Sequence, residues 1–242
     1  MRGREKNSAF FRNDKLNGDS DIAGGLSGVY KSARASGKLI LSARSLTTVP
    51  DGIFSLATSL EEGEKFWEIN PLTKLDLGSN LLSCLPSGKF DLLKADLAYL
   101  QLKDNRLIAL PDDLFNCSIL QYLNLSINAL TGINESIGEL TDLRELYVAN
   151  NKLLSIPSSL ASCRSLQTLE LQHNALVRIP NGSLMLPQLL KLDLSSNKLT
   201  EIPSCISELL LLGKFSEFNS SKISSERDTL CTLQNILVKT KL

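Results

Sequence analysis

Apolar and polar residues follow one pattern that returns along most of the chain. Six segments share LxxLxLxxNxLxx(L/I)P, in which x is mostly polar, and Asn134 replaces the final proline once. Alternation in the LxLx part predicts a short strand with one buried face, and the following residues predict a tight bend and a return segment. The six segments are LTKLDLGSNLLSCLP (72–86), LAYLQLKDNRLIALP (97–111), LQYLNLSINALTGIN (120–134), LRELYVANNKLLSIP (143–157), LQTLELQHNALVRIP (166–180) and LLKLDLSSNKLTEIP (189–203).

The spacing of the shared asparagines predicts a solenoid. The spacing is 25 residues once and then 23 residues four times, within the roughly 20–29 residues of a leucine-rich repeat. An earlier copy, KLILSARSLTTVP (38–50), keeps the leucines but has Arg44 at the asparagine position, and we interpret it as the first turn. The six asparagines are Asn80, Asn105, Asn128, Asn151, Asn174 and Asn197.

Stacking of the turns explains the residue types that recur. One turn alone cannot bury its leucines, so neighbouring turns must pack together to offset the entropy lost on ordering. The bend after each strand turns backbone polar groups inward, and an asparagine amide both donates to and accepts from such groups. We therefore expect a structural ladder of asparagines inside the stack, with about seven repeats in an α/β solenoid whose strands form a parallel sheet.

The segments outside the pattern predict end structures and one insertion. Residues 1–25 are polar without a period, which predicts a disordered tail, and residues 26–37 predict a short N-terminal capping helix that ends at Gly37. Repeats occupy 38–212, with an insertion at about 55–71 that contains Trp67, for which we expect a short helix and a packed tryptophan. Residues 213–242 lose the pattern and are interpreted as a divergent C-terminal tail or cap.

The repeats resemble those of intracellular leucine-rich repeat proteins of the Ras-group scaffold type. The resemblance covers about 38–212, and VYKSARASGKLILSARSLTTVP (29–50) with EKFWEINPLTKLDLGSN (64–80) resembles the start of one member. It implies a horseshoe fold, a non-enzymatic signalling scaffold and a protein partner such as a small GTPase or another signalling protein. Because the recognisable turns stop near residue 212, we interpret the chain as a short isoform or an incomplete product.

Composition adds a cellular setting. The 26 basic and 26 acidic residues cancel, so no global field favours nucleic acid. No apolar run reaches the length of a signal peptide or of a membrane span, so we expect a cytoplasmic or nuclear protein. The five cysteines include no CxxC pair, so we expect reduced thiols, no bound metal and no cofactor.

Two strand positions of each repeat predict the binding surface. Counting the first leucine as position one, positions three and five face away from the core, onto the concave face of the sheet. Three of the four tyrosines fall there on consecutive repeats, and tyrosine is enriched at interface hot spots. The alternative is cross-strand packing that only stabilises the sheet. The candidate partner-binding residues are Tyr99, Gln101, Tyr122, Asn124, Glu145, Tyr147, Glu170 and His173, the last as a single partner-facing histidine beside the strand.

Two other functions stay open. A secreted or surface receptor ectodomain would need a signal peptide and cysteine-rich end caps, and its sequons would include those at Asn124 and Asn181. A cysteine-dependent enzyme using Cys231 would need a catalytic domain, for which the roughly 30 residues after the repeats are too few.

Overall fold

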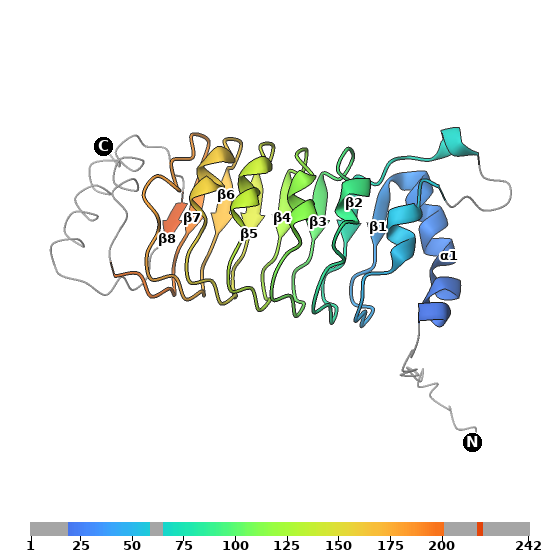
Figure 1. Cartoon of the computed structure of the whole chain (residues 1–242), viewed down its shortest axis with the longest axis horizontal. Helices are drawn as coiled ribbons and strands as arrows, with labels where there is room; N and C mark the ends of the chain where they lie inside the picture. The colour runs from blue at the N-terminus through green and yellow to red at the C-terminus, as the bar shows by residue number, and fades with distance from the viewer. Residues whose placement is uncertain (1–18, 59–64, 201–216, 220–242) are drawn as a thin grey trace, which may run out of the picture.

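The computed structural model describes residues 19–58, 65–200 and 217–219 of the chain. Each repeat forms one turn of a solenoid, and each turn contributes one strand of three residues to a single parallel sheet (Figure 1). The sheet has eight strands in chain order, which confirms the predicted parallel sheet of stacked repeats. The strands are β1 (Lys38–Ile40), β2 (Lys74–Asp76), β3 (Tyr99–Gln101), β4 (Tyr122–Asn124), β5 (Glu145–Tyr147), β6 (Thr168–Glu170), β7 (Lys191–Asp193) and β8 (Glu217–Asn219).

Strands β1–β7 are in strict register because each has a buried central leucine. Leu75 pairs with Leu100, and Leu100 pairs with Leu123, so that equivalent positions of neighbouring repeats lie side by side. The central leucines of β1–β7 are at most 1% exposed. Side chains alternate along a strand, so the first and third residues of each strand lie on the opposite face, away from the core.

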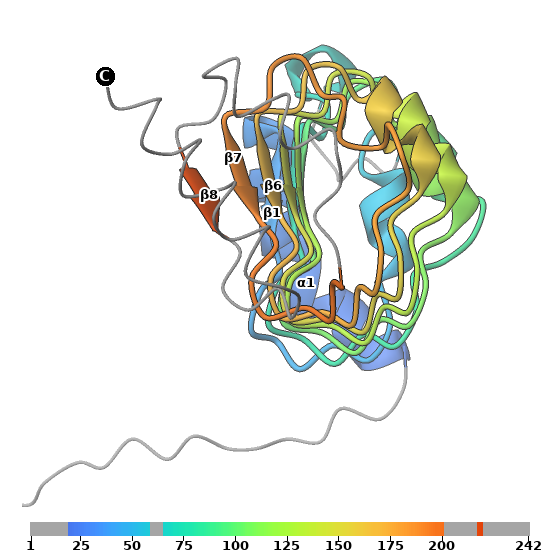
Figure 2. The same ribbon diagram turned by 90° about the vertical axis from the view of Figure 1, so that its left-hand side faces the viewer.

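Short 3-10 helices line the side of the solenoid opposite the sheet (Figure 2). Pro111 and Pro157 precede two of these helices with extended backbone, which the proline ring favours. Asn134 takes the same place before a third helix, and its Oδ1 accepts a hydrogen bond from Ser136 N at 2.9 Å. This N-cap explains why an asparagine replaces the proline there. The 3-10 helices are η1 (Asp51–Ser55), η2 (Phe66–Glu68), η3 (Phe90–Leu92), η4 (Asp112–Asn116), η5 (Glu135–Glu139) and η6 (Ser158–Ser162).

The six asparagines connect consecutive turns as a structural ladder. Asn151 Oδ1 accepts from Leu130 N at 3.0 Å in the preceding turn. Its Nδ2 donates to Leu125 O in that turn at 3.0 Å and to Val148 O in its own turn at 3.1 Å. Asn80, Asn105, Asn128, Asn174 and Asn197 repeat this arrangement. Arg44 lies at the same position of the first turn with an exposed side chain.

An N-terminal helix, α1 (Asp19–Ser36), covers the first turn. Leu26 and Ala33 are buried in the continuous core, and Val29 and Tyr30 pack against it. The helix ends at Gly37, whose φ of 66° is left-handed and whose N–H donates to Ala33 O at 2.8 Å. The predicted end is therefore observed, but residues 19–25, predicted as tail, are helical. These residues include Gly24 and Gly25, each of which a helix tolerates at a cost of about 1 kcal/mol. Residues 1–18 of the predicted tail lie outside the described residues.

The insertion after the first turn carries the short helix η2, as expected for residues 55–71. Trp67 within it is 66% exposed, so the expected packing of this ring is wrong. Lys65 Nζ lies 5.6 Å from the centre of the ring, within the range of a cation–π contact. The insertion therefore presents an aromatic side chain to solvent.

The sheet extends beyond the predicted last repeat. Strand β8 pairs with β7, and Phe218 lies opposite Leu192. Continuing the 23-residue period from Leu192 would place this residue at Phe215, three positions earlier. Because of these three extra residues, a fixed 23-residue period does not predict β8. Residues 217–219 were therefore predicted as part of the divergent tail. The other residues of the predicted tail or cap, 213–242, lie outside the described ranges.

Candidate functional site

The first and third residues of the strands form the concave face of the solenoid. Their side chains lie in two columns across the sheet, because equivalent residues of neighbouring strands are paired. Seven of the eight candidate partner-binding residues lie there. They are Tyr99, Gln101, Tyr122, Asn124, Glu145, Tyr147 and Glu170, on β3–β6.

The three tyrosines form a continuous aromatic cluster on this face. The rings of Tyr99 and Tyr122 are stacked, with centroids 4.1 Å apart and planes within 6°. The ring of Tyr147 lies 5.5 Å from that of Tyr122 and is tilted by 45°. All three side chains are half-buried. Cross-strand packing therefore accounts for part of this cluster, and the remaining ring surface is open to a partner.

A carboxylate fixes the end of the cluster at β5. Tyr147 Oη donates to Glu145 Oε2 at 2.7 Å. Burial, and then this hydrogen bond and the negative charge of Glu145, raise the pKa of Tyr147 above its ordinary value. Burial, followed by the hydroxyl of Tyr122, likewise raises the pKa of Tyr99. Both phenols are therefore neutral donors at physiological pH, and the surface beside them is negative.

Two lysines that were not among the predicted candidates flank the cluster. Lys74 Nζ lies 3.9 Å from the centre of the Tyr99 ring, in a cation–π contact. Lys191 Nζ lies 3.1 Å from Glu170 Oε1, and Gln172 Nε2 donates to Glu170 Oε2 at 3.3 Å. Both lysines occupy position three of their repeats, so the same column that identified Tyr99 and Glu145 could have identified them.

Some polar residues of the face are bonded to their own turn. Asn124 Oδ1 accepts from Ser126 N at 3.0 Å, and the side chain is only 8% exposed. Asp76, Gln101 and Asp193 accept from the backbone two residues on in the same way. These oxygens accept hydrogen bonds from backbone N–H groups of the turn that follows the strand. They leave less hydrogen-bonding capacity for a partner, which shifts the candidate site toward Tyr122, Glu145, Tyr147 and Glu170.

His173 lies apart from the concave columns. It occupies position eight, in the bend after β6, where its side chain is exposed and its φ is +57°. Non-glycine residues with positive φ recur at this position, at Asp104, Ile127 and Asn150 among others. Histidine and asparagine tolerate this conformation better than most residues. The position of His173 therefore has a backbone explanation, independent of a partner.

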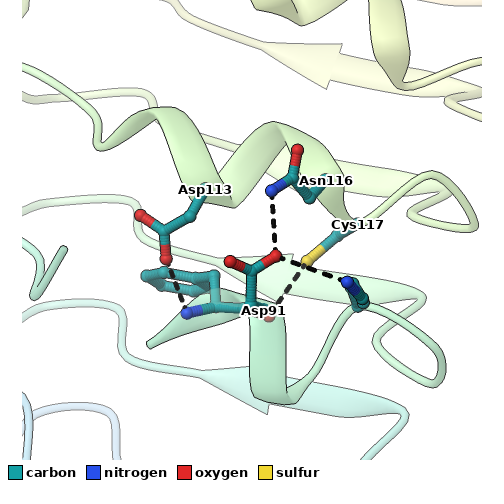
Figure 3. A network of polar contacts seen from close by, with 6 residues as sticks. Asp91, Asp113, Asn116 and Cys117 are labelled. Carbon is teal, nitrogen blue, oxygen red and sulfur yellow. Dashed lines mark hydrogen bonds and ion pairs between the residues drawn. The ribbon is translucent and has the colours of Figure 1, made fainter. Parts of the chain in front are cut away.

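Polar side chains on the helical side join neighbouring turns to one another (Figure 3). Asp113 Oδ2 accepts from Phe90 N at 2.7 Å, and Asn116 Nδ2 donates to Asp91 Oδ1 at 2.9 Å. Cys117 Sγ donates to Phe90 O at 3.8 Å. Burial, and then the charges of Asp113 and Asp91, raise the pKa of the Cys117 thiol to about 12. The thiol is thus a protonated hydrogen-bond donor, unsuited to nucleophilic chemistry.

Cys163 has the equivalent place two turns on. Its Sγ donates to Ile137 O at 3.2 Å, and burial raises its pKa to about 12. Cys231, the candidate of the enzyme alternative, lies outside the described residues. The described residues include no group of three or more His, Cys, Asp or Glu placed to hold a metal ion. Within the described ranges, no helix has both the length and the apolar character needed to cross a membrane.

Comparison with known protein families finds the repeat itself. A family model described as a leucine-rich repeat matches residues 95–153 and 164–213. Those residues contain β3–β7 and therefore the whole candidate site.

Solved structures of leucine-rich repeat proteins are similar in fold. A leucine-rich repeat protein of Leptospira interrogans aligns with a TM-score of 0.59 and 22% identity, over 86% of this chain and 67% of the other. TLR13, in a complex with ssRNA13, aligns with a TM-score of 0.57 and 27% identity, over 66% of this chain and 23% of the other. The plant peptide hormone receptor RGFR1, in complex with RGF2, aligns with a TM-score of 0.52 and 28% identity, over 64% of this chain and 29% of the other. The chain thus spans less than a third of the two last proteins.

Proposed function

We propose that this chain, whose repeats match the leucine-rich repeat model, is a non-enzymatic intracellular scaffold that binds a protein partner on its concave face. Leucine-rich repeat folds generally mediate protein–protein interaction, and the proteins that carry them are typically non-enzymatic. The proposed contact surface is centred on β3–β6.

The observation that carries this proposal is the tyrosine cluster. Tyr99, Tyr122 and Tyr147 lie on consecutive strands and are only half-buried, and the hydroxyl of Tyr147 donates to Glu145 Oε2. Large, rigid aromatic surface with a polar tip is the chemistry of interface hot spots. Packing of the rings against one another also holds them in place, which lowers the entropy lost on binding.

The cellular setting and the type of partner are part of the same proposal. Cys84, Cys117 and Cys163 are free thiols, which suits a reducing compartment such as the cytoplasm or nucleus. The repeats resemble those of Ras-group scaffolds, and residues 29–50 and 64–80 resemble the start of leucine-rich repeat-containing protein 40. We therefore propose a small GTPase or another signalling protein as the partner.

Site-specific photo-crosslinking in cells tests the location of the contact. A photo-reactive amino acid replaces Thr168, on the concave face of β6, or Ser162, an exposed residue of η6 on the helical side. We expect a discrete protein adduct from position 168 and none from position 162, because only the first position lies on the proposed surface. Equal adducts at both positions, or none at position 168, would contradict the concave surface.

A receptor ectodomain is the second candidate, favoured by the likeness to RGFR1 in its complex with RGF2. Asn181 is exposed and begins an Asn-Gly-Ser sequon, whereas the amide of Asn124 is buried and bonded to Tyr122 Oη at 3.2 Å. Passage through the secretory pathway would place a glycan on Asn181. For an intracellular scaffold, we expect no mass shift on endoglycosidase treatment of the protein from cells.

Nucleic acid is disfavoured by the charge of the central face, despite the likeness to TLR13 in its complex with ssRNA13. The first and third residues of β3–β6 include no lysine or arginine, and the charged ones are Glu145 and Glu170. Binding to phosphates needs cationic side chains. A protein partner therefore fits this surface better than RNA.

A further inference from the structure

The lysines on the concave face reveal which chemical groups this surface accepts. One ammonium, of Lys74, lies over a tyrosine ring at 3.9 Å, and another, of Lys191, contacts a carboxylate oxygen of Glu170 at 3.1 Å. One contact thus places a cation against an aromatic face, and the other places a cation against a glutamate. These are the groups that bind a cationic side chain in interfaces.

Between the two lysines, the same pair of groups lies open over β4–β6. The ring of Tyr147 has Tyr122 on one side and Glu170 directly opposite on the neighbouring strand. Glu145 Oε2 accepts from Tyr147 Oη, while in the described part of the chain Oε1 of Glu145 accepts no hydrogen bond and no cation lies within 4.0 Å of it. The carboxylate is therefore held in orientation through one oxygen, and its other oxygen has no partner among the described residues.

We propose that this site, formed by Tyr122, Glu145, Tyr147 and Glu170, binds an arginine side chain of the protein partner. The inference rests on the proposed function and specifies the chemistry of the same face. A guanidinium is planar, so it stacks on a tyrosine ring while its N–H groups donate to a carboxylate in the plane. An ammonium is compact and strongly hydrated, so it satisfies only one of these two geometries at a time.

The charge around the site favours such a guest. Glu145 and Glu170 are the charged residues among the first and third positions of β3–β6, and only Glu170 has a lysine against it. A guanidinium that binds between the two glutamates would balance the charge of Glu145. A phosphate group placed there would instead meet uncompensated negative charge.

The test measures binding of small arginine and citrulline probes to the full chain by NMR. The chain has four tyrosines, so ring-labelled tyrosine gives few signals, which single Tyr→Phe changes assign. Tyr30, on α1, serves as an internal reference. The probes are N-acetyl-arginine methylamide and N-acetyl-citrulline methylamide, which have similar shapes but differ in charge. We expect the arginine probe to shift Tyr122 and Tyr147 and to bind about fivefold or more tightly than the citrulline probe.

Variants define the contribution of the carboxylate. Glu145→Gln should reduce the affinity for the arginine probe to that for the citrulline probe, because the amide presents no negative charge. Glu139→Gln removes an exposed carboxylate from η5 on the helical side, with the same change in net charge, and should leave the affinity unchanged. Circular dichroism confirms that both variants are folded.

Several outcomes overturn the arginine site. They are equal affinity for arginine and citrulline, no effect of Glu145→Gln, equally tight binding of N-acetyl-lysine methylamide, and shifts of Tyr122 and Tyr147 by a single-stranded RNA oligonucleotide. Crosslinking at position 168 distinguishes failure of the arginine site from failure of the proposed scaffold function. A persistent adduct there, with no arginine preference, rejects only the arginine site, whereas loss of the adduct with arginine binding intact rejects the scaffold proposal.

Discussion

At the scale of single residues, the amide of each repeat asparagine is shared between two turns. Asn151 satisfies Leu130 N and Leu125 O in the preceding turn and Val148 O in its own. An amide is required because the position must both donate and accept, and a carboxylate would do only one. This need follows from the backbone geometry of a tight bend, which is why the sequence pattern alone was enough to predict it.

Removal of one such amide should weaken the stack. Asn151→Ala leaves three buried backbone groups without their partner, so we expect the free energy of unfolding to fall by about 1–3 kcal/mol. Arg44→Ala should change it much less, because the Arg44 side chain is exposed. Urea denaturation followed by circular dichroism compares the two variants, and equal mild effects would contradict the structural role of the ladder.

The bend before each asparagine contains a feature that the sequence pattern did not predict. Position eight has a positive φ in all seven repeats of β1–β7, at Ala43, Ser79, Asp104, Ile127, Asn150, His173 and Ser196. No glycine appears at this position, and glycine is the usual sequence signal for such a conformation. The stacked turns impose a positive φ at this position, and residue types that differ in their tolerance of this conformation all adopt it.

Ile127 is the least suited residue at position eight. Its φ is +57°, a conformation that a β-branched residue rarely adopts, and 42% of its surface is exposed. Ile127→Asn should therefore raise the free energy of unfolding by about 1 kcal/mol, since little burial is lost and strain is relieved. Asn150→Ile is the reverse change in the next repeat and should lower it by about the same amount. A stability change of the same sign in both variants would contradict this explanation.

At the scale of elements, local patterns predicted strands well and ends less well. The central leucine fixed the register of β1–β7, since a shift by one would expose the leucine. The start of α1 was placed seven residues late because the residues up to 25 show no apolar period, while packing of Leu26 and Ala33 on the first turn holds the helix in place. Tertiary contact thus overrides a weak local preference. The exposed Trp67 was mispredicted because a short insertion offered it no core.

The end of α1 depends on one glycine, and a second glycine provides a matched control. Gly37 and Gly88 have φ values of +66° and +71°, but a Cβ at Gly37 would lie 2.6 Å from Pro71 O, whereas nothing lies within 4 Å at Gly88. Gly88→Ala should cost about 1–2 kcal/mol from backbone strain alone. Gly37→Ala should cost more, because the close approach adds to the strain and disturbs the contact between α1 and the second turn. Thermal and urea denaturation measure the loss of stability in both variants, and equal losses would contradict this expectation.

At the scale of the whole molecule, the period of the sequence predicted the order of the turns and the face that each strand residue occupies. It placed seven of the eight candidate residues on one surface. It missed β8, because three added residues break the period. The period also could not distinguish tyrosines that pack on neighbouring strands from tyrosines that are available to a partner, because the distinction depends on the orientation of the rings across the strands. The structure shows ring packing across the three strands, with stacking tightest between Tyr99 and Tyr122.

This geometry makes the tyrosines of the concave face unequal. Tyr122 contacts a ring on each side, so Tyr122→Ala should lower the free energy of unfolding by about 1–2 kcal/mol in addition to weakening binding. Tyr147 has one ring contact at 5.5 Å and a hydrogen bond to Glu145, so Tyr147→Ala should have a smaller effect on stability. Both truncations should weaken capture of the partner crosslinked at position 168 by about 2 kcal/mol, the range of hot-spot aromatics.

Measuring stability and affinity on the same variants separates binding from packing. Lys89→Ala is the control on the helical side, where the exposed ammonium lies 3.5 Å from Asp51 Oδ1, and it should alter neither quantity appreciably. Affinity must be expressed per folded molecule, since Tyr122→Ala lowers the folded fraction as well. If Tyr147→Ala lowers stability as much as Tyr122→Ala does and leaves affinity intact, the cluster serves only to hold the sheet together. A loss of affinity in Tyr147→Ala that exceeds its loss of stability assigns the ring to the partner, because a side chain with a single aromatic neighbour contributes little to the stack and much to an interface.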